Sequence, residues 1–504
     1  MLFLGFSAGV PILLIFSSLS LWLREAGVEK SAVTFFSWAA LGYSFKFIWA
    51  PLVDRLPVPV LTTLVGRRRA WLLLAQLAVM ASILWMASID PAGGASALTV
   101  MALAAVALGF SSATQDIVID AYRIESGTSD LQAMMSSTYV AGYRIGMLVA
   151  GAGALFLAAG FGSTAEHYSY KAWFMTYVIM ASVMLVGVVT TLLAPEPASY
   201  RDIDEKHRTS DHLRFLAAFV VAVFAFVLMF RMIGGISGAL GESLVAAWGN
   251  EALAGFVAAL FRLGLAIGAA AVAARGMVLV GAVDGGMVRE AYLDPVFDFF
   301  RRHGKGLAIL LLLIVGFYRV SDIVLGVIAN VFYQDIGYTK EEIASVSKVF
   351  GLWMTISGGF VGGLMAMTFG VMPILFLGAV LSALTNLLFM LLAGSDASLP
   401  MLFVVIGADN LSAGLATAAF IAFLSSLTNV RFTAVQYAIF SSLMTLLPKV
   451  LGGYSGSMVE SMGYSNFFLL TALMTVPVLL LLLLAWRVFD PDELEAAAID
   501  RAES

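Results

Sequence analysis

The chain has 504 residues, of which 61% are hydrophobic and only 12% are charged, and its mean hydropathy is +0.95. Soluble domains carry roughly twice that charged fraction, and no water-soluble fold can bury so much apolar surface, so a soluble protein is excluded. The net charge of -5 comes without a basic stripe outside the apolar segments, which argues against a nucleic-acid partner, and the lack of cysteine excludes disulfides and thiolate chemistry.

Apolar stretches of bilayer-spanning length follow one another along the chain. The first six predicted helices lie near 1–23, 33–52, 71–88, 97–118, 136–160 and 171–193. Two more candidates lie near 213–233 and 252–274, and a last group of six lies near 306–332, 341–366, 371–393, 400–424, 434–457 and 465–486. The pattern predicts an all-α membrane protein with two six-helix halves plus about two inserted helices, about 14 in total.

Four segments follow from this pattern: an amino-terminal half (1–195), a central segment (196–304), a carboxyl-terminal half (305–488) and an acidic cytoplasmic tail (489–504). The central segment combines a charged loop, the two inserted helices and an amphipathic stretch, 288–303, which we expect to form a helix on the cytoplasmic surface. Arg262 interrupts the second inserted span, so a re-entrant or interfacial hairpin is an open alternative to two spanning helices.

The distribution of basic residues predicts the orientation. With the amino terminus in the cytoplasm, about 17 of the 28 Lys and Arg fall in cytoplasmic loops and tails, against about four outside. We therefore expect both termini in the cytoplasm. The two halves also share a motif in which one cation precedes glycines, at 142–146 and at 448–453. Such halves are typical of transporters that bind substrate between them near the membrane midplane.

Acidic residues at bilayer depth are the candidates for proton coupling, because an ionisable residue there costs about 2.5–3.5 kcal/mol unless it has a partner or a watery cavity. The candidates are Asp116, Asp120, Asp322 and Asp409. Asp116 and Asp120 are four residues apart and share a helix face. Two alternatives are purely structural: Asp120 pairs with Arg123, and Asp322 is neutralised by Arg319, three residues away.

Polar residues and cations in the same helices are the candidates for binding an anionic substrate, since guanidinium groups suit carboxylates. The set comprises Gln115, Tyr143, Arg144, Arg319, Lys348, Asn410, Lys449 and Lys46. For Lys46, an alternative is that its side chain extends toward the cytoplasmic interface. Asp409 has no cation within one turn, so we expect it to titrate or to pair with Lys348 or Lys449 across a cavity.

Neither a metal site nor an enzyme is expected. The four histidines fall in predicted loops or helix ends and share no ligand spacing. No nucleophile occurs with a base, and no metal motif is present. We expect no cofactor, and we expect a proton as the coupling ion.

Several short motifs, in order, carry a resemblance to a known family. They are Gly5-Phe-Ser-Ala-Gly-Val-Pro11, Phe47-Ile-Trp-Ala-Pro-Leu-Val-Asp-Arg55, Gly66-Arg-Arg-Arg-Ala-Trp-Leu-Leu73, Gln115-Asp-Ile-Val-Ile-Asp-Ala121, Gly142-Tyr-Arg-Ile-Gly-Met-Leu-Val149 and Leu193-Ala-Pro-Glu-Pro197. Through these motifs the sequence resembles the AmpG muropeptide permeases. The resemblance runs through both halves, to about Trp486. The resemblance implies a major facilitator fold, the bacterial inner membrane and proton-driven import of anhydromuropeptides for peptidoglycan recycling, which in some bacteria feeds beta-lactamase induction.

The resemblance also implies a gate in the loop between the second and third helices. Major facilitator proteins carry a signature of acidic and basic residues there, and the matching positions are Asp54, Arg55, Arg67, Arg68 and Arg69. We interpret them as conformational residues that latch helix ends together. The sequence departs from the family in its long spacer, 56–65, in Ala50 where a glycine is usual, and in a turn, 366–373, that lacks basic residues.

Two other functions fit the same helices. One is an exporter of drugs or sugars, and the other is a membrane sensor that binds muropeptide without transporting it. For partners, we expect a small-molecule substrate and the lipid bilayer, with the chain as a monomer.

Overall fold

The computed structural model describes residues 1–28, 41–128, 131–164, 167–197, 209–249, 251–452 and 454–486. Every regular element in these ranges is a helix, which confirms the all-α prediction. Thirteen of the described helices are long and apolar enough to cross a membrane. Part of the predicted second helix, at 33–40, lies outside the described residues, as do the central charged loop and the acidic tail.

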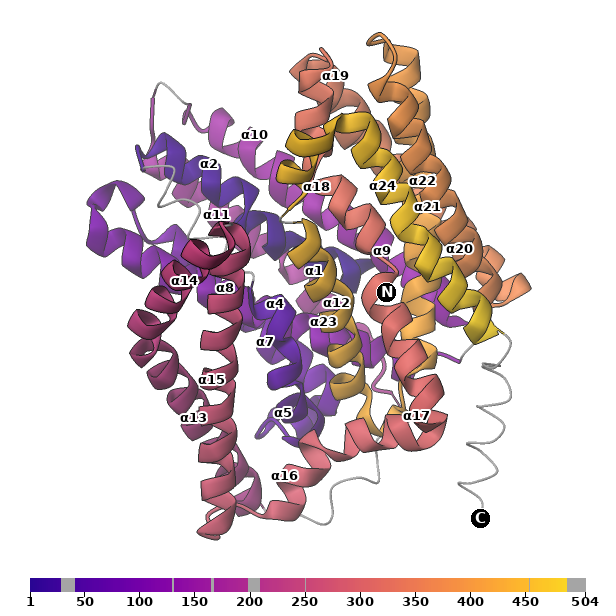
Figure 1. The fold of residues 1–504 in the computed structure, drawn as a ribbon. Coiled ribbons are helices and arrows are strands. Elements are labelled where there is room, and N and C mark those ends of the chain that lie inside the picture. Colours follow the sequence, from indigo (N-terminus) through magenta and orange to yellow (C-terminus); the bar gives the residue numbers. More distant parts are fainter. Residues whose placement is uncertain are drawn as a thin grey trace. The chain divides into compact units, whose positions relative to one another are not determined.

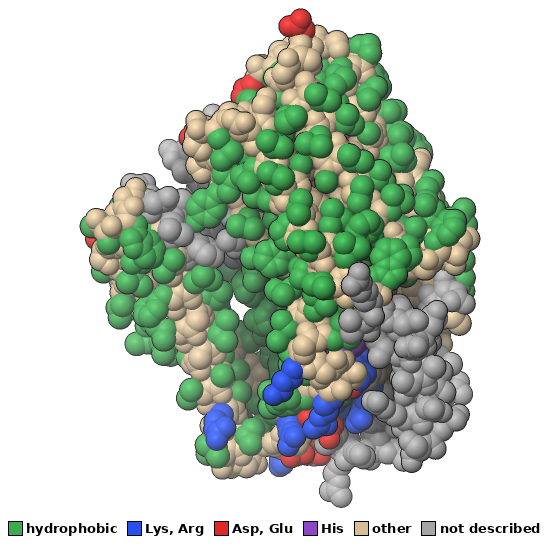
Figure 2. All heavy atoms as spheres, turned by 45° about the vertical axis from the view of Figure 1, so that its right-hand side comes forward, with side chains coloured by type: hydrophobic (Ala, Val, Ile, Leu, Met, Phe, Trp, Pro, Cys, Tyr) green, Lys and Arg blue, Asp and Glu red, His purple; other side chains and the backbone are tan. Residues whose placement is uncertain are grey.

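Contacts divide the chain into two compact units. The first unit combines Met1–Ser199 with Asp298–Ser504, and the second is Tyr200–Phe297. The four segments expected from the sequence rest on its pattern of apolar and charged stretches and not on contacts, so their boundaries stay predictions. Hydrophobic side chains cover most of the face drawn in Figure 2, as a lipid-embedded surface requires.

The amino-terminal half of the first unit (Figure 1) contains α1 (Leu2–Ile15), α2 (Ser17–Glu25), α4 (Leu41–Phe45), η2 (Lys46–Ile48), α5 (Ala50–Arg55), α6 (Leu61–Val65), α7 (Arg67–Ala87), η3 (Pro91–Gly93), α8 (Ala95–Ser126), α9 (Gln132–Leu148), the π-helix η5 (Val149–Gly153), α10 (Ala154–Gly160), α11 (Tyr170–Val183) and α12 (Leu185–Leu193). Helix α8 extends well past its predicted end near 118. Asp120 and Arg123 therefore lie within a regular helix.

The carboxyl-terminal half contains α17 (Asp294–Phe317), α18 (Val320–Asp335), α19 (Lys340–Ile343), the π-helix η7 (Ala344–Phe350), α20 (Gly351–Phe369), α21 (Val371–Ala393), α22 (Leu399–Ser426), η8 (Val430–Phe432), α23 (Thr433–Gly452) and α24 (Ser455–Trp486). Helix α17 bends at Gly304, whose φ of 73° is a left-handed value that glycine adopts without strain. The bend separates the part before Gly304, which is the end of the predicted surface helix at 288–303, from the apolar part after it.

The second unit contains α13 (Thr209–Met232), α14 (Gly234–Trp248), α15 (Glu251–Leu279) and α16 (Gly285–Tyr292), and α15 packs against both α13 and α14. Two helical segments in it, Ser210–Met232 and Val257–Leu279, have the length and composition of membrane spans. Arg262 does not interrupt α15. Its Nε donates to the carbonyl oxygen of Phe230 at 2.7 Å and its guanidinium lies 3.9 Å from the Phe230 ring centroid, which gives the cation partners near the end of α13.

Small residues bring helix backbones into direct contact within each half. At Gly9 in α1, a Cβ atom would lie 2.0 Å from the carbonyl oxygen of Tyr143 in α9. At Gly358 in α20, a Cβ atom would lie 2.0 Å from the carbonyl oxygen of Leu411 in α22. Glycine is therefore required at both crossings, as in other closely packed membrane helices.

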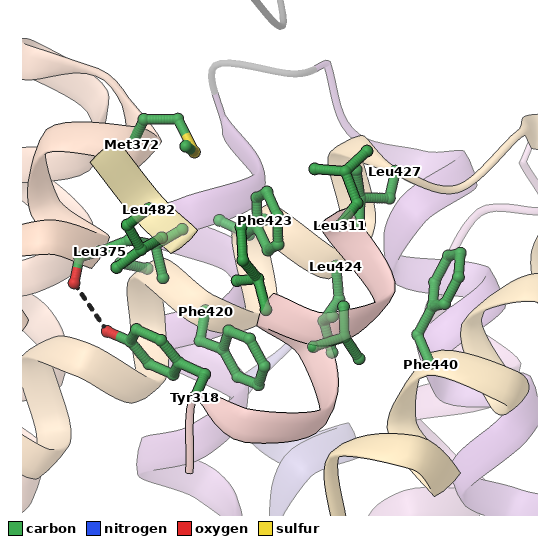
Figure 3. Close-up of a cluster of buried hydrophobic side chains, with 14 of the residues drawn as sticks. Leu311, Tyr318, Met372, Leu375, Phe420, Phe423, Leu424, Leu427, Phe440 and Leu482 are labelled. Atoms are coloured by element: carbon green, nitrogen blue, oxygen red, sulfur yellow. Dashed lines mark hydrogen bonds between the residues drawn. The ribbon is translucent and has the colours of Figure 1, made fainter. Parts of the chain in front are cut away.

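The core of the carboxyl-terminal half (Figure 3) is built mainly by side chains of α17 and α21–α24, joined by Ala366 of α20 and, from the other half, Ile124 of α8 and Ala133 of α9. Tyr318, which directly follows α17, stacks on Phe420 of α22 at 4.5 Å, and its hydroxyl donates to the carbonyl oxygen of Leu375 in α21 at 3.0 Å. Because the hydroxyl has a partner, the aromatic ring can be buried without leaving a polar group unsatisfied.

Candidate functional site

A buried charge cluster lies in the amino-terminal half. Lys46, only 4% exposed, comes from η2 and contacts Oδ2 of Asp116 on α8. The same Nζ atom lies 3.6 Å from Oδ2 of Asp120, one turn further along α8. The hydroxyl of Tyr139 on α9 donates to Oδ1 of Asp116 at 2.8 Å. One lysine is therefore shared by two carboxylates, and its side chain is tied to them inside the bundle instead of reaching the interface.

Arg123 extends this cluster into the other half. It lies 3.5 Å from Asp120, as the structural alternative expected. Its Nη1 also donates to Ser136 on α9 at 3.0 Å and to Ser425 on α22 at 2.8 Å, and its guanidinium lies 5.3 Å from the ring centroid of Tyr437 on α23. Arg123 is thus more than the local partner of Asp120, because it also joins the two halves.

Hydroxyl groups surround the charged residues of the carboxyl-terminal half. Arg319 precedes α18, donates to Oγ1 of Thr417 at 2.5 Å and lies 3.8 Å from Asp322. Asp322 accepts a hydrogen bond from Ser382. The ion pair between Arg319 and Asp322 that the sequence offered as an alternative is therefore present, but at a longer distance than either hydrogen bond to a hydroxyl.

Asp409 has a polar partner but no ion pair with any cation whose side chain the structure describes. Its Oδ1 accepts a hydrogen bond from Thr385 at 3.3 Å. Asp409 and Asp322 are close enough for their charges to repel. Of the two cations expected as partners, Lys449 instead donates to Ser44 on α4 at 3.3 Å, and the side chain of Lys348, in η7, is outside the described residues.

The other predicted binding residues have different surroundings. Gln115 is fully buried and donates to Ser7 of α1 at 3.1 Å. Asn410 accepts a hydrogen bond from Thr355 of α20 at 2.9 Å. The Tyr143 ring lies 6.0 Å from that of Tyr139. These contacts tie each residue to its own half, and their role in binding stays a prediction.

Arg144 stands out among the deep cations. It is half-buried on α9, next to Tyr143, and forms no hydrogen bond or ion pair with the residues the structure describes. It is close enough to Arg319 in the other half for the two positive charges to repel. Two guanidinium groups from different halves that are close enough to repel form a site where an anion would be stabilised.

A second network, at the end of the first unit that carries the basic loop residues, joins the ends of several helices. Arg68 is fully buried, and its Nη2 lies 2.8 Å from Asp54 and 2.5 Å from Glu125 of α8. The two oxygens of Asp54 accept from the backbone amides of Ala434 and Val435, at 3.3 and 3.0 Å. Asp54 therefore caps the start of α23 across the interface between the halves, where the helix dipole favours a negative charge.

The neighbouring basic residues hold the same end of the amino-terminal half together. Arg67 donates to the carbonyl oxygen of Val53 at 3.4 Å, and Arg69 donates to those of Thr191 and Leu192 at 2.9 and 2.6 Å. Arg55 is the last residue of α5 and is partly buried.

Sequence reasoning missed several partners. Tyr139 is four residues before Tyr143, so the spacing on one helix face was a usable signal. Glu196, whose carboxylate accepts from the backbone amides of Arg68 and Arg69 at 2.7 and 3.1 Å, lies in a motif of the family resemblance. Glu125 and Ser425 were not identifiable, because Glu125 was expected in a loop and Ser425 lies about 300 residues from Arg123.

Comparison with known proteins decides the family. The chain is 30% identical over 480 residues to "Putative transporter AmpG 4" of Rickettsia felis (strain ATCC VR-1525 / URRWXCal2), covering 95% of this chain and 94% of that protein. The chain belongs to the AmpG family. It is also 27% identical over 491 residues to "Anhydromuropeptide permease" of Escherichia coli (strain K12), covering 97% of this chain and 80% of that protein.

The chain is also similar to a family model and to a solved structure. The model described as "Acetyl-coenzyme A transporter 1" matches residues 1–194. The structure of the major facilitator proton:xylose symporter XylE bound to 6-bromo-6-deoxy-D-glucose superimposes with a TM-score of 0.60 at 14% identity, covering 98% of this chain and 97% of that one. The fold is thus the major facilitator fold, as expected. This AmpG family member is a multi-pass membrane transporter.

Proposed function

We propose that this transporter imports anhydromuropeptides, the N-acetylglucosamine to anhydro-N-acetylmuramic acid disaccharide with or without its peptide, from periplasm to cytoplasm, driven by protons. The name of the Escherichia coli relative, which aligns with 97% of the chain, supports the substrate. The basic loop residues support an inner-membrane orientation with both termini in the cytoplasm. We take the transporting form to be a monomer.

One observation carries the proton coupling: Lys46 is shared by two carboxylates. With Asp116 and Asp120 both ionised, one ammonium group serves two negative charges. If Asp116 took up a proton, Lys46 would form an ion pair with Asp120 only. The contacts within the cluster would therefore change. The Asp116 side chain is 17% exposed and that of Asp120 only 8%, so Asp116 is the more accessible to a proton. Asp409 is the alternative site, because protonation would remove the cost of an unpaired charge.

The substrate would meet the two guanidinium groups between the halves. A muropeptide carries carboxylates on its lactyl or peptide part, and Arg144 and Arg319 belong to different halves. An anion bound to both would offset their repulsion and draw the halves together. Substrate binding would thereby favour closure around the substrate, which alternating access requires.

The contacts between Asp54 and α23 would form the gate on the cytoplasmic side. They join the halves at the end that carries the basic loop, and Ser137 of α9 donates to the carbonyl oxygen of Gly359 in α20 at 2.7 Å in the same interface. Release of substrate into the cytoplasm would require these contacts to break. One proton crossing the membrane supplies about 2.3 kcal/mol per 100 mV toward this cycle.

The test is uptake of labelled N-acetylglucosaminyl-anhydromuropeptide into permease-deficient vesicles that carry this protein, with and without a protonophore. We expect accumulation that the protonophore abolishes. Asp116→Asn should lose uphill accumulation but retain exchange of labelled for unlabelled substrate. Well-inserted protein without uptake would contradict the muropeptide assignment, and uphill uptake in both Asp116→Asn and Asp409→Asn would contradict the proton sites.

A further inference from the structure

A polar cluster outside the gate holds the turn between α22 and α23. Asp298, in the first part of α17, accepts hydrogen bonds from Arg302 at 2.9 Å, from Asn429 at 3.1 Å and from Gln436 at 2.9 Å. The other end of the Gln436 amide accepts from the backbone amide of Asn429 at 2.7 Å and from Arg302 at 3.1 Å. Arg302 also donates to the carbonyl oxygen of Leu427 at 3.0 Å. Both ends of the turn are therefore tied to α17.

The first turn of α23, which follows this connection, presents the amides that Asp54 binds. Gln436 directly follows Val435, whose amide donates to Asp54, and it is only 1% exposed. The direction of the first amides of α23 thus depends on a helical turn that the hydrogen bond between Gln436 and Asp298 also holds. Hydrogen bonds to a carboxylate weaken steeply when donor direction changes, so a small rotation of this turn would loosen the cap.

The cluster lies where the chain passes from the second unit back into the first. Phe297 is the last residue of the second unit, so Asp298 is the first residue of the carboxyl-terminal half that the chain reaches after the insert. The turn 366–373, by contrast, has no basic residue to build a second gate of the amino-terminal type. Asp298 and Arg302, both in α17, are charged groups that hold the carboxyl-terminal side of this contact.

We propose that Asp298 and Gln436 are positioning residues of the gate, which hold the first turn of α23 so that its amides meet Asp54. Neither residue contacts Asp54. Replacing either would weaken the closed gate because the α23 amides would then bind Asp54 less well. This inference rests on the gate of the proposed function. It does not depend on the identity of the substrate.

The experiment measures gate opening without substrate. The chain has no cysteine, so Ser137→Cys introduces a single thiol at a site that is 1% exposed and lies between the halves. The rate at which maleimide labels this thiol is measured in nanodiscs. The Ser137→Cys protein is compared with proteins that also carry D54N, D298N, Q436A or the double change D54N/D298N. The matched control is D294N, one turn earlier on α17, where Asp294 pairs with the exposed Arg289 at 3.4 Å.

We expect labelling to accelerate about tenfold in D54N and about threefold in D298N and Q436A, with D294N unchanged. The double variant should label as fast as D54N alone, because both changes act on one contact. Elution as a single species shows that each variant is folded, and Q436A tests the cluster without changing a charge.

Three results would overturn the inference. Labelling of D298N and Q436A at the control rate, with D54N accelerated, would remove the positioning role and leave the gate intact. A double variant that is faster than D54N by the full effect of D298N would show that Asp298 acts elsewhere. Labelling of D54N at the control rate would overturn the gate in the proposed function, and this inference with it.

Discussion

In the amino-terminal half, the acids Asp116 and Asp120 face the cations Lys46 and Arg123, whereas in the carboxyl-terminal half Asp322 and Asp409 accept hydrogen bonds from hydroxyl groups. The first cluster balances its charges among its own members. The second holds two acids that repel, with Arg319 at 3.8 Å from one of them.

This difference matters for how each cluster responds to a proton. Adding a proton to the first cluster breaks a balanced set of ion pairs, so contacts must rearrange. Adding one to the second relieves repulsion and leaves the hydroxyl hydrogen bonds largely as they are. We therefore place the step that changes conformation in the amino-terminal half, and the following predictions test that assignment.

The largest expected effect is that of Lys46→Met. It leaves two buried carboxylates with only Arg123 nearby, and removing one partner of a buried ion pair costs about 3–5 kcal/mol. We expect a lower melting temperature in nanodiscs and a loss of uptake of at least about 100-fold. Asp116→Asn added to Lys46→Met should recover part of the stability but not the coupling. Unchanged stability in Lys46→Met would show that the cluster is not the balanced set described above.

The next effect is on substrate affinity. Arg144→Gln and Arg319→Gln each remove a cation that we expect to bind an anion, and a hydrogen bond to a charged group contributes about 1.5–3 kcal/mol. The KM for the anionic muropeptide should rise about 10- to 100-fold in each. The control is Arg24→Gln, where the lost contact is to the carbonyl oxygen of Val28 at 3.1 Å. Equal KM values in all three variants would remove both arginines from the binding site.

Asp409→Asn tests most directly whether the proton site lies in the amino-terminal or the carboxyl-terminal half. Asparagine keeps the size of the side chain and an oxygen for the hydrogen bond from Thr385, so we expect stability to change by less than about 1 kcal/mol. Uphill accumulation should persist, reduced by about threefold, because repulsion with Asp322 is gone. The measurement is the ratio of internal to external substrate. If accumulation is lost and exchange remains, the proton site belongs to the carboxyl-terminal half and the comparison is reversed.

The smallest effect is expected for Thr385→Val, which removes a hydrogen bond of 3.3 Å to Asp409. A bond this long lies at the weak end of the about 0.5–1.5 kcal/mol that a hydrogen bond contributes, so uptake should fall by no more than about threefold. Thr385→Ser keeps the hydroxyl and should match the unchanged protein. A loss as large as that of Lys46→Met would mean that the hydroxyl network controls the cycle.

Part of the candidate site was accessible from the sequence. Asp116 and Asp120 were expected on one face because four residues make about one helical turn, and the charge of Lys46 marked it as a residue in need of a partner. Their mutual contact was not predictable, since Lys46 and Asp116 lie 70 residues apart and only helix packing brings them together. Hydroxyl partners such as Ser382 gave no signal, because serine is common in membrane helices without a functional role.

The sequence by itself determined the class of protein, the succession of helices and the family. Hydrophobic length and small-residue motifs act locally, so they can be read along the chain. Tertiary structure alone decided which partner each charged group contacts. Lys46 contacts both acids instead of reaching the interface, Lys449 donates to Ser44 instead of pairing with Asp409, and Asp54 binds the amides of α23. The physical reason is that partner choice in a membrane bundle depends on the rotation and crossing of helices, which backbone contacts at glycines such as Gly9 and Gly358 set in three dimensions.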